Sequence, residues 1–389
     1  MKKKSNSKIE AFKKGRWCKK LDLQDFVYRN YTPYEGDESF LMPATQRTDQ
    51  IWKKVTTWMK KERERNGVLD IDVKTPGAIT SHAPGFIDRP NEKILGLQTN
   101  KPLKRAIKPV GGVRLVEKAC TARGYKLDPS VKETFTKYRT THNDAVFSIY
   151  TDEMRRLRRL GILTGLPDTY ARGRIIGDYR RVALYGLDFL ISEKRKDLAK
   201  LDNAMDTTVI RLREEVAKQV NALMEMETLG RQYGIDLSGP SETAHEAIQW
   251  TYLAYLAAAK ESDGAAMSLG NLSAFFDIFI CRDITAGRLD ESGAQELIDD
   301  FIIKLRMIRQ LRAPEYDDIF AGDPVWATVV LSGMGEDGRA KVTKTDFRFL
   351  QSLRNLGPSP EPNLTVLYSP RLPDGWKNFV SRMAVETSS

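Results

Sequence analysis

The segment from Ala244 to Ala259 constrains the fold of this chain more than any other part of the sequence. A helix built from it would carry apolar side chains around nearly its whole circumference, among them Ile248, Trp250 and Tyr255. A helix that is apolar all round is buried on most of its sides. The sequence therefore predicts a central helix with other elements packed around it.

Periodic apolar positions predict further helices. Apolar residues recur at intervals of three and four within 51–59 and 209–223, which is the spacing of amphipathic helices. Another helix is predicted to open with Ser292 and Gln295 in capping-box spacing. Its last turn is basic, which complements the negative end of the helix dipole. Each of these helices is expected to bury one face against the core.

Strand signals are fewer and lie toward the end of the chain. An apolar run at 328–331 ends at a Ser-Gly turn, and a second run at 364–368 follows the proline-rich turn at 357–362. These patterns predict a helix-rich α/β or α+β fold. A chain of 389 residues is long enough for one large core or two domains, and no repeat or convincing linker divides it. Residues 1–389 are therefore expected to form one unit.

The composition indicates a folded protein with anionic partners. Lys and Arg number 62 against 52 Asp and Glu, which gives a formal net charge of +10 and fits nucleic acid, small carboxylates and phosphorylated cofactors equally well. Cys18, Cys120 and Cys281 are far apart and the histidines are scattered, so neither a disulfide framework nor a metal site is predicted. Neither a secretory signal nor a stretch of about 18 apolar residues is found, so a cytoplasmic protein without membrane contact is expected.

A glycine-rich basic block at 165–181 contains the most informative residue, Arg174. Glycines on both sides of Arg174 would let the backbone approach a ligand closely. The guanidinium is a planar fork of donors that matches a carboxylate, which makes Arg174 a natural anchor for a small carboxylic acid. Considered alone, the same pattern also fits a loop that enters a helix with solvated arginines.

Further segments accompany this block in a specific order along nearly the whole chain. They lie at residues 30–40, 79–82, 96–99, 102–106, 249–252, 264–268, 322–328 and 357–363. No single segment is diagnostic, but the ordered set is highly specific. In this set the chain resembles the N-terminal part of the pyruvate formate-lyases, a family of glycyl radical enzymes.

The resemblance implies a fold, a reaction and a set of partners. The expected fold is the helix-rich N-terminal portion of the ten-stranded α/β barrel of glycyl radical enzymes. The implied activity is formate C-acetyltransferase, an acyltransferase of pyruvate metabolism and anaerobic glucose fermentation that converts pyruvate and coenzyme A (CoA) to formate and acetyl-CoA. CoA is the implied co-substrate, with no permanently bound cofactor, and the glycyl radical belongs to a complete chain. A radical-SAM activating enzyme and a homodimer are implied as well.

The resemblance also assigns roles at the implied substrate pocket. Arg174 would hold the pyruvate carboxylate, while Ala265, Phe320 and Trp326 would line the same pocket. An apolar aromatic wall keeps water and stray hydrogen donors away from a carbon-centred radical. Without the family, core packing is the simpler interpretation of Phe320 and Trp326.

A second cluster combines Phe147 with four arginines between 155 and 159. An aromatic face beside a dense cationic turn suits a nucleotide with phosphates, although a solvated helical face is an equally good interpretation. The corresponding region of the family binds CoA. The resemblance therefore assigns the adenine contact to Phe147 and the phosphate contacts to Arg158 and Arg159.

The adjacent cysteines and the radical glycine loop of the family do not occur within these 389 residues. The sequence is therefore expected to be an N-terminal pyruvate formate-lyase domain, truncated before its catalytic residues and inactive by itself. The alternative is a non-catalytic acyl-CoA-binding protein or a regulatory partner of a full-length enzyme. RNA binding through the arginines is disfavoured, because the alternating aromatic and basic pattern of single-strand readers is absent.

Overall fold

The computed structural model describes residues 11–108, 113–139, 147–163, 177–262, 267–320 and 325–388, except for the side chains of 316, 319 and 320. Its helices are α1 (Leu23–Asn30), α2 (Gln46–Glu64), α3 (Val113–Thr121), α4 (Pro129–Glu133), α6 (Asp152–Arg159), α8 (Arg180–Lys200), α9 (Thr207–Gln232), α10 (Ala244–Glu261), α11 (Ser273–Thr285), α12 (Glu291–Met307), α13 (Pro314–Phe320), α14 (Lys344–Leu356) and α15 (Asp374–Thr387). Shorter helical turns are η1 (Arg16–Cys18), η2 (Glu38–Phe40) and η3 (Thr134–Tyr138). The strands are β1 (Asp70–Pro76), β2 (Lys104–Ile107), β3 (Thr328–Ser332) and β4 (Asn363–Leu367). None of the helices described here combines the length and the apolar character needed to cross a membrane.

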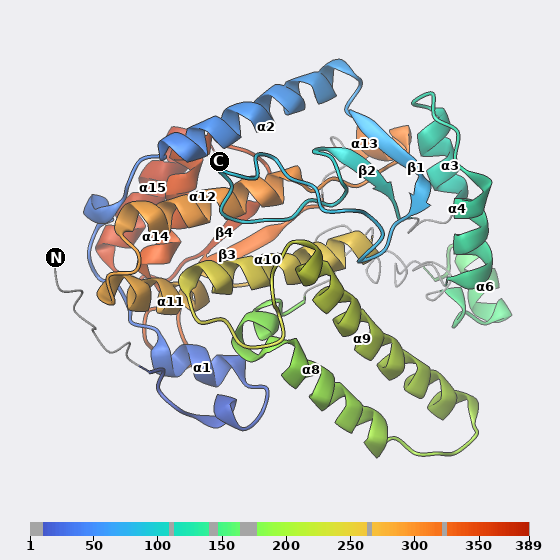
Figure 1. The fold of residues 1–389 in the computed structure, drawn as a ribbon, viewed down its shortest axis with the longest axis horizontal. Helices are drawn as coiled ribbons and strands as arrows, with labels where there is room; N and C mark the ends of the chain where they lie inside the picture. The colour runs from blue at the N-terminus through green and yellow to red at the C-terminus, as the bar shows by residue number, and fades with distance from the viewer. Residues whose placement is uncertain are drawn as a thin grey trace.

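Helix α10 lies centrally and is buried along nearly its whole length, as the sequence predicts (Figure 1). The Thr243 side chain caps its start by accepting a hydrogen bond from the backbone N–H of Glu246. Helices α8, α9, α11 and α12 pack around it. Tyr252 and Tyr255 are fully buried, and the Tyr252 hydroxyl donates to the carbonyl of Gly96 at 3.0 Å. The polar tips of these aromatic side chains therefore hold neighbouring loops against the central helix.

Helices α8 and α9 form a pair whose far end extends away from the other helices (Figure 1). Helix α8 is interrupted at Gly186, whose φ of 73° and ψ of 164° lie outside the helical region. The break allows the N–H groups of Leu187 and Asp188 to donate to the carbonyl groups of Leu237 and Ser238, at 2.8 and 3.1 Å. The start of α8 is therefore joined to the segment that precedes α10.

The apolar face predicted for α9 is covered only in part. Val216 and Val220 are buried, which confirms the predicted face near the middle of the helix. Leu212 is 43% exposed, because the first turns of α9 lie in the projecting part of the helix pair (Figure 1). The apolar spacing predicted the helix correctly but not the extent of its burial.

Helix α12 begins earlier than the sequence pattern predicts. Its N-cap is Asp290, whose carboxylate accepts a hydrogen bond from the N–H of Gly293 at 2.7 Å. Ser292 therefore lies inside the first turn, and the Gln295 amide donates to the buried Asp299 instead of closing a capping box. The predicted start was wrong because an acidic side chain two residues upstream reaches the first free N–H groups of the helix.

The strands form two parallel pairs, β1 with β2 and β3 with β4. β3 starts at the predicted residue, while β4 begins one residue earlier than predicted and leaves Tyr368 outside it. Gly270 forms a further parallel bridge with Val329, so β3 lies between the segment at 267–270 and β4. Parallel strands surrounded by many helices confirm the helix-rich α/β class.

Two hydrophobic clusters hold these elements together. The larger gathers around α10, α11, α12 and α14, and the smaller joins β1 and β2 to α3 and α4. Cys120 belongs to the smaller cluster and forms no disulfide. Burial raises the pKa of its thiol to about 11, so at neutral pH the thiol stays protonated and inert.

Candidate functional site

Three segments that adjoin predicted pocket residues meet in the structure. The N–H of Met267 donates to the carbonyl of Val325 at 3.1 Å, and the Tyr255 hydroxyl donates to the carbonyl of Met267 at 3.4 Å. The ring of Tyr179 packs edge-on against Tyr255, with the ring centroids 5.2 Å apart. Met267 lies two residues after one predicted pocket residue, Val325 immediately before another, and Tyr179 five residues after the predicted carboxylate anchor.

The predicted pocket residues themselves are described to different degrees. Arg174 and Ala265 lie outside the described residues, and Phe320 ends α13 with its side chain also outside them. Trp326 is half-buried, and its backbone φ of 51° lies in the left-handed region. For a bulky side chain such a φ is an outlier, and outliers of this kind cluster at functional sites. Trp326 is thus the one predicted pocket residue whose side chain belongs to the described part of the structure.

Arg180 anchors the end of the glycine-rich block. Its guanidinium donates to both carboxylate oxygens of Asp178, at 2.8 and 3.1 Å, and to the carbonyl of Asn271 at 3.0 Å. Tyr179, between Asp178 and Arg180 in the sequence, is buried, and burial raises the pKa of its hydroxyl to about 12. No role was predicted for Arg180, because its partner Asn271 lies 91 residues further along the chain.

Two of the predicted CoA-binding residues, Phe147 and Arg158, contact each other. The guanidinium carbon of Arg158 lies 5.4 Å from the ring centroid of Phe147 and 5.8 Å from that of Tyr150. The two rings pack edge-on with their centroids 5.4 Å apart, so the Arg158 guanidinium lies close to both of them. Sequence reasoning missed Tyr150, although an aromatic residue three positions after Phe147 was a visible signal.

The other arginines of α6 have separate contacts. Arg155 donates to two carbonyl groups of the preceding turn, at 2.8 and 3.2 Å, and so fixes that turn to the helix. Arg156 makes two hydrogen bonds to Glu153. Arg159 is exposed, and its guanidinium forms no ion pair with any residue that the structure describes. Within this run, Arg159 is therefore the cation best placed to meet an anionic ligand.

A buried cation at the end of α10 was not predicted. Lys260 is buried and donates to the carbonyl of Gln98 at 3.2 Å, and burial lowers its pKa to about 8. Burial, assisted by the charge of Lys260, lowers the pKa of His82 to about 4, against the opposing effect of Asp72 at 3.4 Å. His82 is thus neutral at pH 7, while Lys260 stays mostly protonated. The sequence showed both residues but could not show that both are buried.

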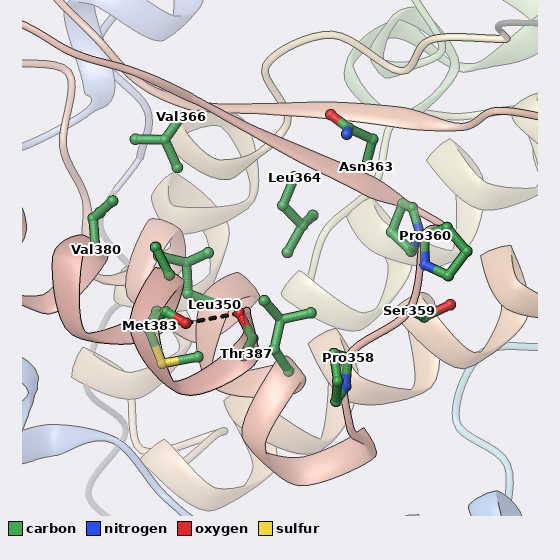
Figure 2. A pocket seen from close by; sticks show the side chains of 13 residues that line it. Leu350, Pro358, Ser359, Pro360, Asn363, Leu364, Val366, Val380, Met383 and Thr387 are labelled. Atoms are coloured by element: carbon green, nitrogen blue, oxygen red, sulfur yellow. Dashed lines mark hydrogen bonds between the residues drawn. The ribbon is translucent and has the colours of Figure 1, made fainter. Parts of the chain in front are cut away.

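A groove of about 590 Å³ opens beside β4. Figure 2 shows Leu364 and Val366 of the strand facing Val380 and Met383 of α15, with the proline-rich turn at 358–362 beside them. The residues that line the groove include no charged side chain. The groove therefore offers an apolar packing surface rather than groups for catalysis.

The chain is similar to a known enzyme over almost its whole length. It is 51% identical over 385 residues to formate acetyltransferase 1 from Escherichia coli (strain K12). The alignment covers 98% of this chain and 51% of that enzyme, so the chain spans about half the length of this relative.

Solved structures share the fold at lower identity. The glycerol-bound B12-independent glycerol dehydratase from Clostridium butyricum matches with a TM-score of 0.67 and 17% identity, over 90% of this chain and 50% of that one. A glycyl radical enzyme from Archaeoglobus fulgidus matches with a TM-score of 0.57 and 14% identity, over 92% of this chain and 49% of that one. These likenesses confirm the predicted glycyl radical enzyme fold and nothing beyond the fold.

The family model described as "PFL-like: Pyruvate formate lyase-like" matches residues 18–389. This match spans nearly all of the sequence and agrees with the 51% identity to formate acetyltransferase 1. The family resemblance inferred from the ordered segments is thereby confirmed. The chain belongs to the pyruvate formate lyase-like family.

Proposed function

We propose that this chain supplies the substrate-binding half of a formate C-acetyltransferase, which converts pyruvate and CoA to formate and acetyl-CoA. The observation that carries the proposal is the 51% identity to formate acetyltransferase 1 over 98% of the chain. In this function Arg174 holds the pyruvate carboxylate, and Ala265, Phe320 and Trp326 line the pocket. The radical chemistry is assigned to residues that correspond to the other half of the relative.

The contacts of neighbouring residues support a single pocket. The hydrogen bond from Met267 to Val325 and the packing of Tyr179 on Tyr255 bring the flanks of the proposed pocket residues together. The left-handed backbone of Trp326 adds a strained position at the same place. These features are typical of a site whose geometry is held by its surroundings.

CoA is proposed as a co-substrate that binds along α6, between the turn that precedes the helix and its last turn. Phe147 offers a ring for the adenine, and the nearby Arg158 and the exposed Arg159 offer charge to the phosphates. The proposal also includes a radical-SAM activating enzyme and a homodimeric assembly, which follow from the family, and a cytoplasmic location.

Reconstitution tests this function. The chain is co-expressed with the half of E. coli formate acetyltransferase 1 that the alignment does not cover, and the complex is activated anaerobically by a radical-SAM activating enzyme. We expect formate and acetyl-CoA from pyruvate and CoA, and none from the chain alone. Arg174→Lys keeps the charge but loses the bidentate fork, so turnover should fall by orders of magnitude.

Calorimetric titration of the chain with CoA gives a second measurement that needs no radical. Absence of both CoA binding and turnover would contradict the proposed function. CoA binding without turnover in the reconstituted complex would instead favour the alternative of a non-catalytic acyl-CoA-binding protein.

A further inference from the structure

The backbone of Trp326 is held in an unfavourable conformation. Its φ of 51° lies in the left-handed region, which costs about 1–3 kcal/mol for a residue other than glycine. Such a conformation persists only where surrounding contacts impose it. The contacts on either side of Trp326 therefore show what fixes the direction in which its indole leaves the chain.

Three hydrogen bonds hold the two neighbours of Trp326. The carbonyl of Val325 accepts from Met267 N–H at 3.1 Å, and the carbonyl of Ala327 accepts from Asn363 N–H at 2.7 Å. The N–H of Ala327 donates to Oε1 of Glu361 at 3.0 Å. Val325 and Ala327 are fully buried, so water cannot replace these partners. Only the third bond uses a side chain, which makes Glu361 the position where substitution can remove an anchor.

The position of Glu361 is itself fixed by α12. Arg306 donates to the carbonyl of Glu361 at 3.2 Å and to those of Leu356 and Gly357 at 3.2 and 2.8 Å. Burial lowers the pKa of Arg306 to about 10, so its guanidinium stays charged at neutral pH. One buried cation thus organises the turn that carries Glu361. The path of contacts runs from α12 through this turn to the residue after Trp326.

We infer that Glu361 is a positioning residue for Trp326 and, through it, for the wall of the substrate pocket; the second part rests on the proposed function. A carboxylate can only accept hydrogen bonds, so it cannot turn a donor toward the N–H of Ala327. Glu361 is itself buried, so water cannot compete for this bond, which suits a contact that must hold a strained neighbour.

Fluorine NMR of the chain labelled with 5-fluorotryptophan tests this inference. The chain has six tryptophans, and Trp326→Phe identifies the resonance of Trp326. Glu361→Met has a similar length but no acceptor, and we expect it to shift the Trp326 resonance and to remove the protection of Ala327 N–H against hydrogen exchange. Glu361→Gln keeps an acceptor oxygen and should retain most of both signals.

Val329→Ala is the matched control. Val329 is fully buried in β3 near the same site, so its truncation lowers stability without touching Glu361. We expect the Trp326 resonance to stay in place in this variant. Should Glu361→Met not fold, Arg306→Lys loosens the same turn, because an ammonium cannot bond three carbonyl groups in the same fork, and it should shift the same resonance.

An unchanged Trp326 resonance in both Glu361→Met and Arg306→Lys would overturn the inference, as would an equal shift in Val329→Ala. The measurement needs no turnover, so its result is separate from that of the proposed function. If pyruvate turnover is reconstituted, Glu361→Met should lower kcat for pyruvate while CoA affinity stays the same. If the Trp326 resonance shifts but the kinetics do not change, Glu361 still positions Trp326 but has no effect on the substrate pocket.

Discussion

Gly186 is the residue at which α8 departs from helical geometry. Its φ is 73°, and a Cβ at this position would lie 2.3 Å from the carbonyl oxygen of Ser238. We expect Gly186→Ala to lower the thermal midpoint strongly, because the new methyl meets backbone that cannot move aside. Gly234→Ala is the control, since Gly234 has a similar φ of 76° but nothing within 4 Å of a Cβ, so only backbone strain of about 1–2 kcal/mol remains. Equal losses in the two variants would show that the contact with Ser238 has no influence.

Asp299 gives a prediction about pH. Burial raises its pKa to about 6 from 3.8, although hydrogen bonds from Ser352, Gln295 and Asn355 oppose the shift. The folded state then holds this proton more tightly than the unfolded state. The resulting stability is fully present below about pH 4 and is lost as pH rises through about 6, and the loss is about 3 kcal/mol at most.

Thermal midpoints measured from pH 4 to pH 7 test this effect. Asp299→Asn cannot titrate, so its midpoint should fall less steeply over this range than that of the unmodified chain, whatever its absolute value. Asp197→Asn, at an exposed position of α8, should leave the slope unchanged. A slope that is the same with and without Asp299 would contradict the prediction.

At the scale of elements, α6 is a helix with no buried residue, so its arginines are not part of the core. We expect Arg158→Gln with Arg159→Gln to weaken CoA binding by tenfold or more, since each charge-assisted hydrogen bond contributes about 1.5–3 kcal/mol. Pyruvate binding should change far less.

Arg156→Gln on the same helix is the matched control, because Arg156 already pairs with Glu153. Calorimetric titration with CoA measures all of these variants. An equal loss of CoA affinity in Arg156→Gln, or equal effects on CoA and pyruvate, would remove the assignment of a CoA site to α6.

At the scale of the whole molecule, β4 is the outer strand of its sheet within the described residues, and the apolar groove lies beside it (Figure 2). Leu367 and Tyr368, at its end, are 47% and 74% exposed. An unpaired strand edge next to an apolar surface favours self-association. We expect the purified chain to form oligomers and Leu367→Lys with Tyr368→Lys to raise its monomer fraction in light scattering after size exclusion.

Met205→Lys is the control for that experiment. Met205 is 86% exposed in the connection between α8 and α9, at the projecting end of this helix pair (Figure 1), so a charge there should not change the monomer fraction. A monodisperse monomer from the unmodified chain would show that the edge of β4 does not drive association.

The sequence by itself determined the elements whose patterns are local. The buried helix α10 and the strands β3 and β4 follow from runs of apolar residues, and they were predicted to within a few residues. The cluster of Phe147 with Arg158 was also predicted, because both lie within twelve residues of one another. The ordered family segments predicted the fold of the whole chain, because each segment is a short run of residues that can be recognised from the sequence alone.

The tertiary structure alone decided the features that depend on distant partners. The burial of Lys260, the exposure of Leu212 and the anchoring of Arg180 on Asn271 all depend on which elements lie alongside, and periodicity carries no such information. The left-handed backbone of Trp326 has the same origin, because the bond that holds its neighbour comes from Glu361, 34 residues away from Ala327. Local sequence determines which backbone conformations are low in free energy, whereas long-range contacts stabilise the unfavourable ones.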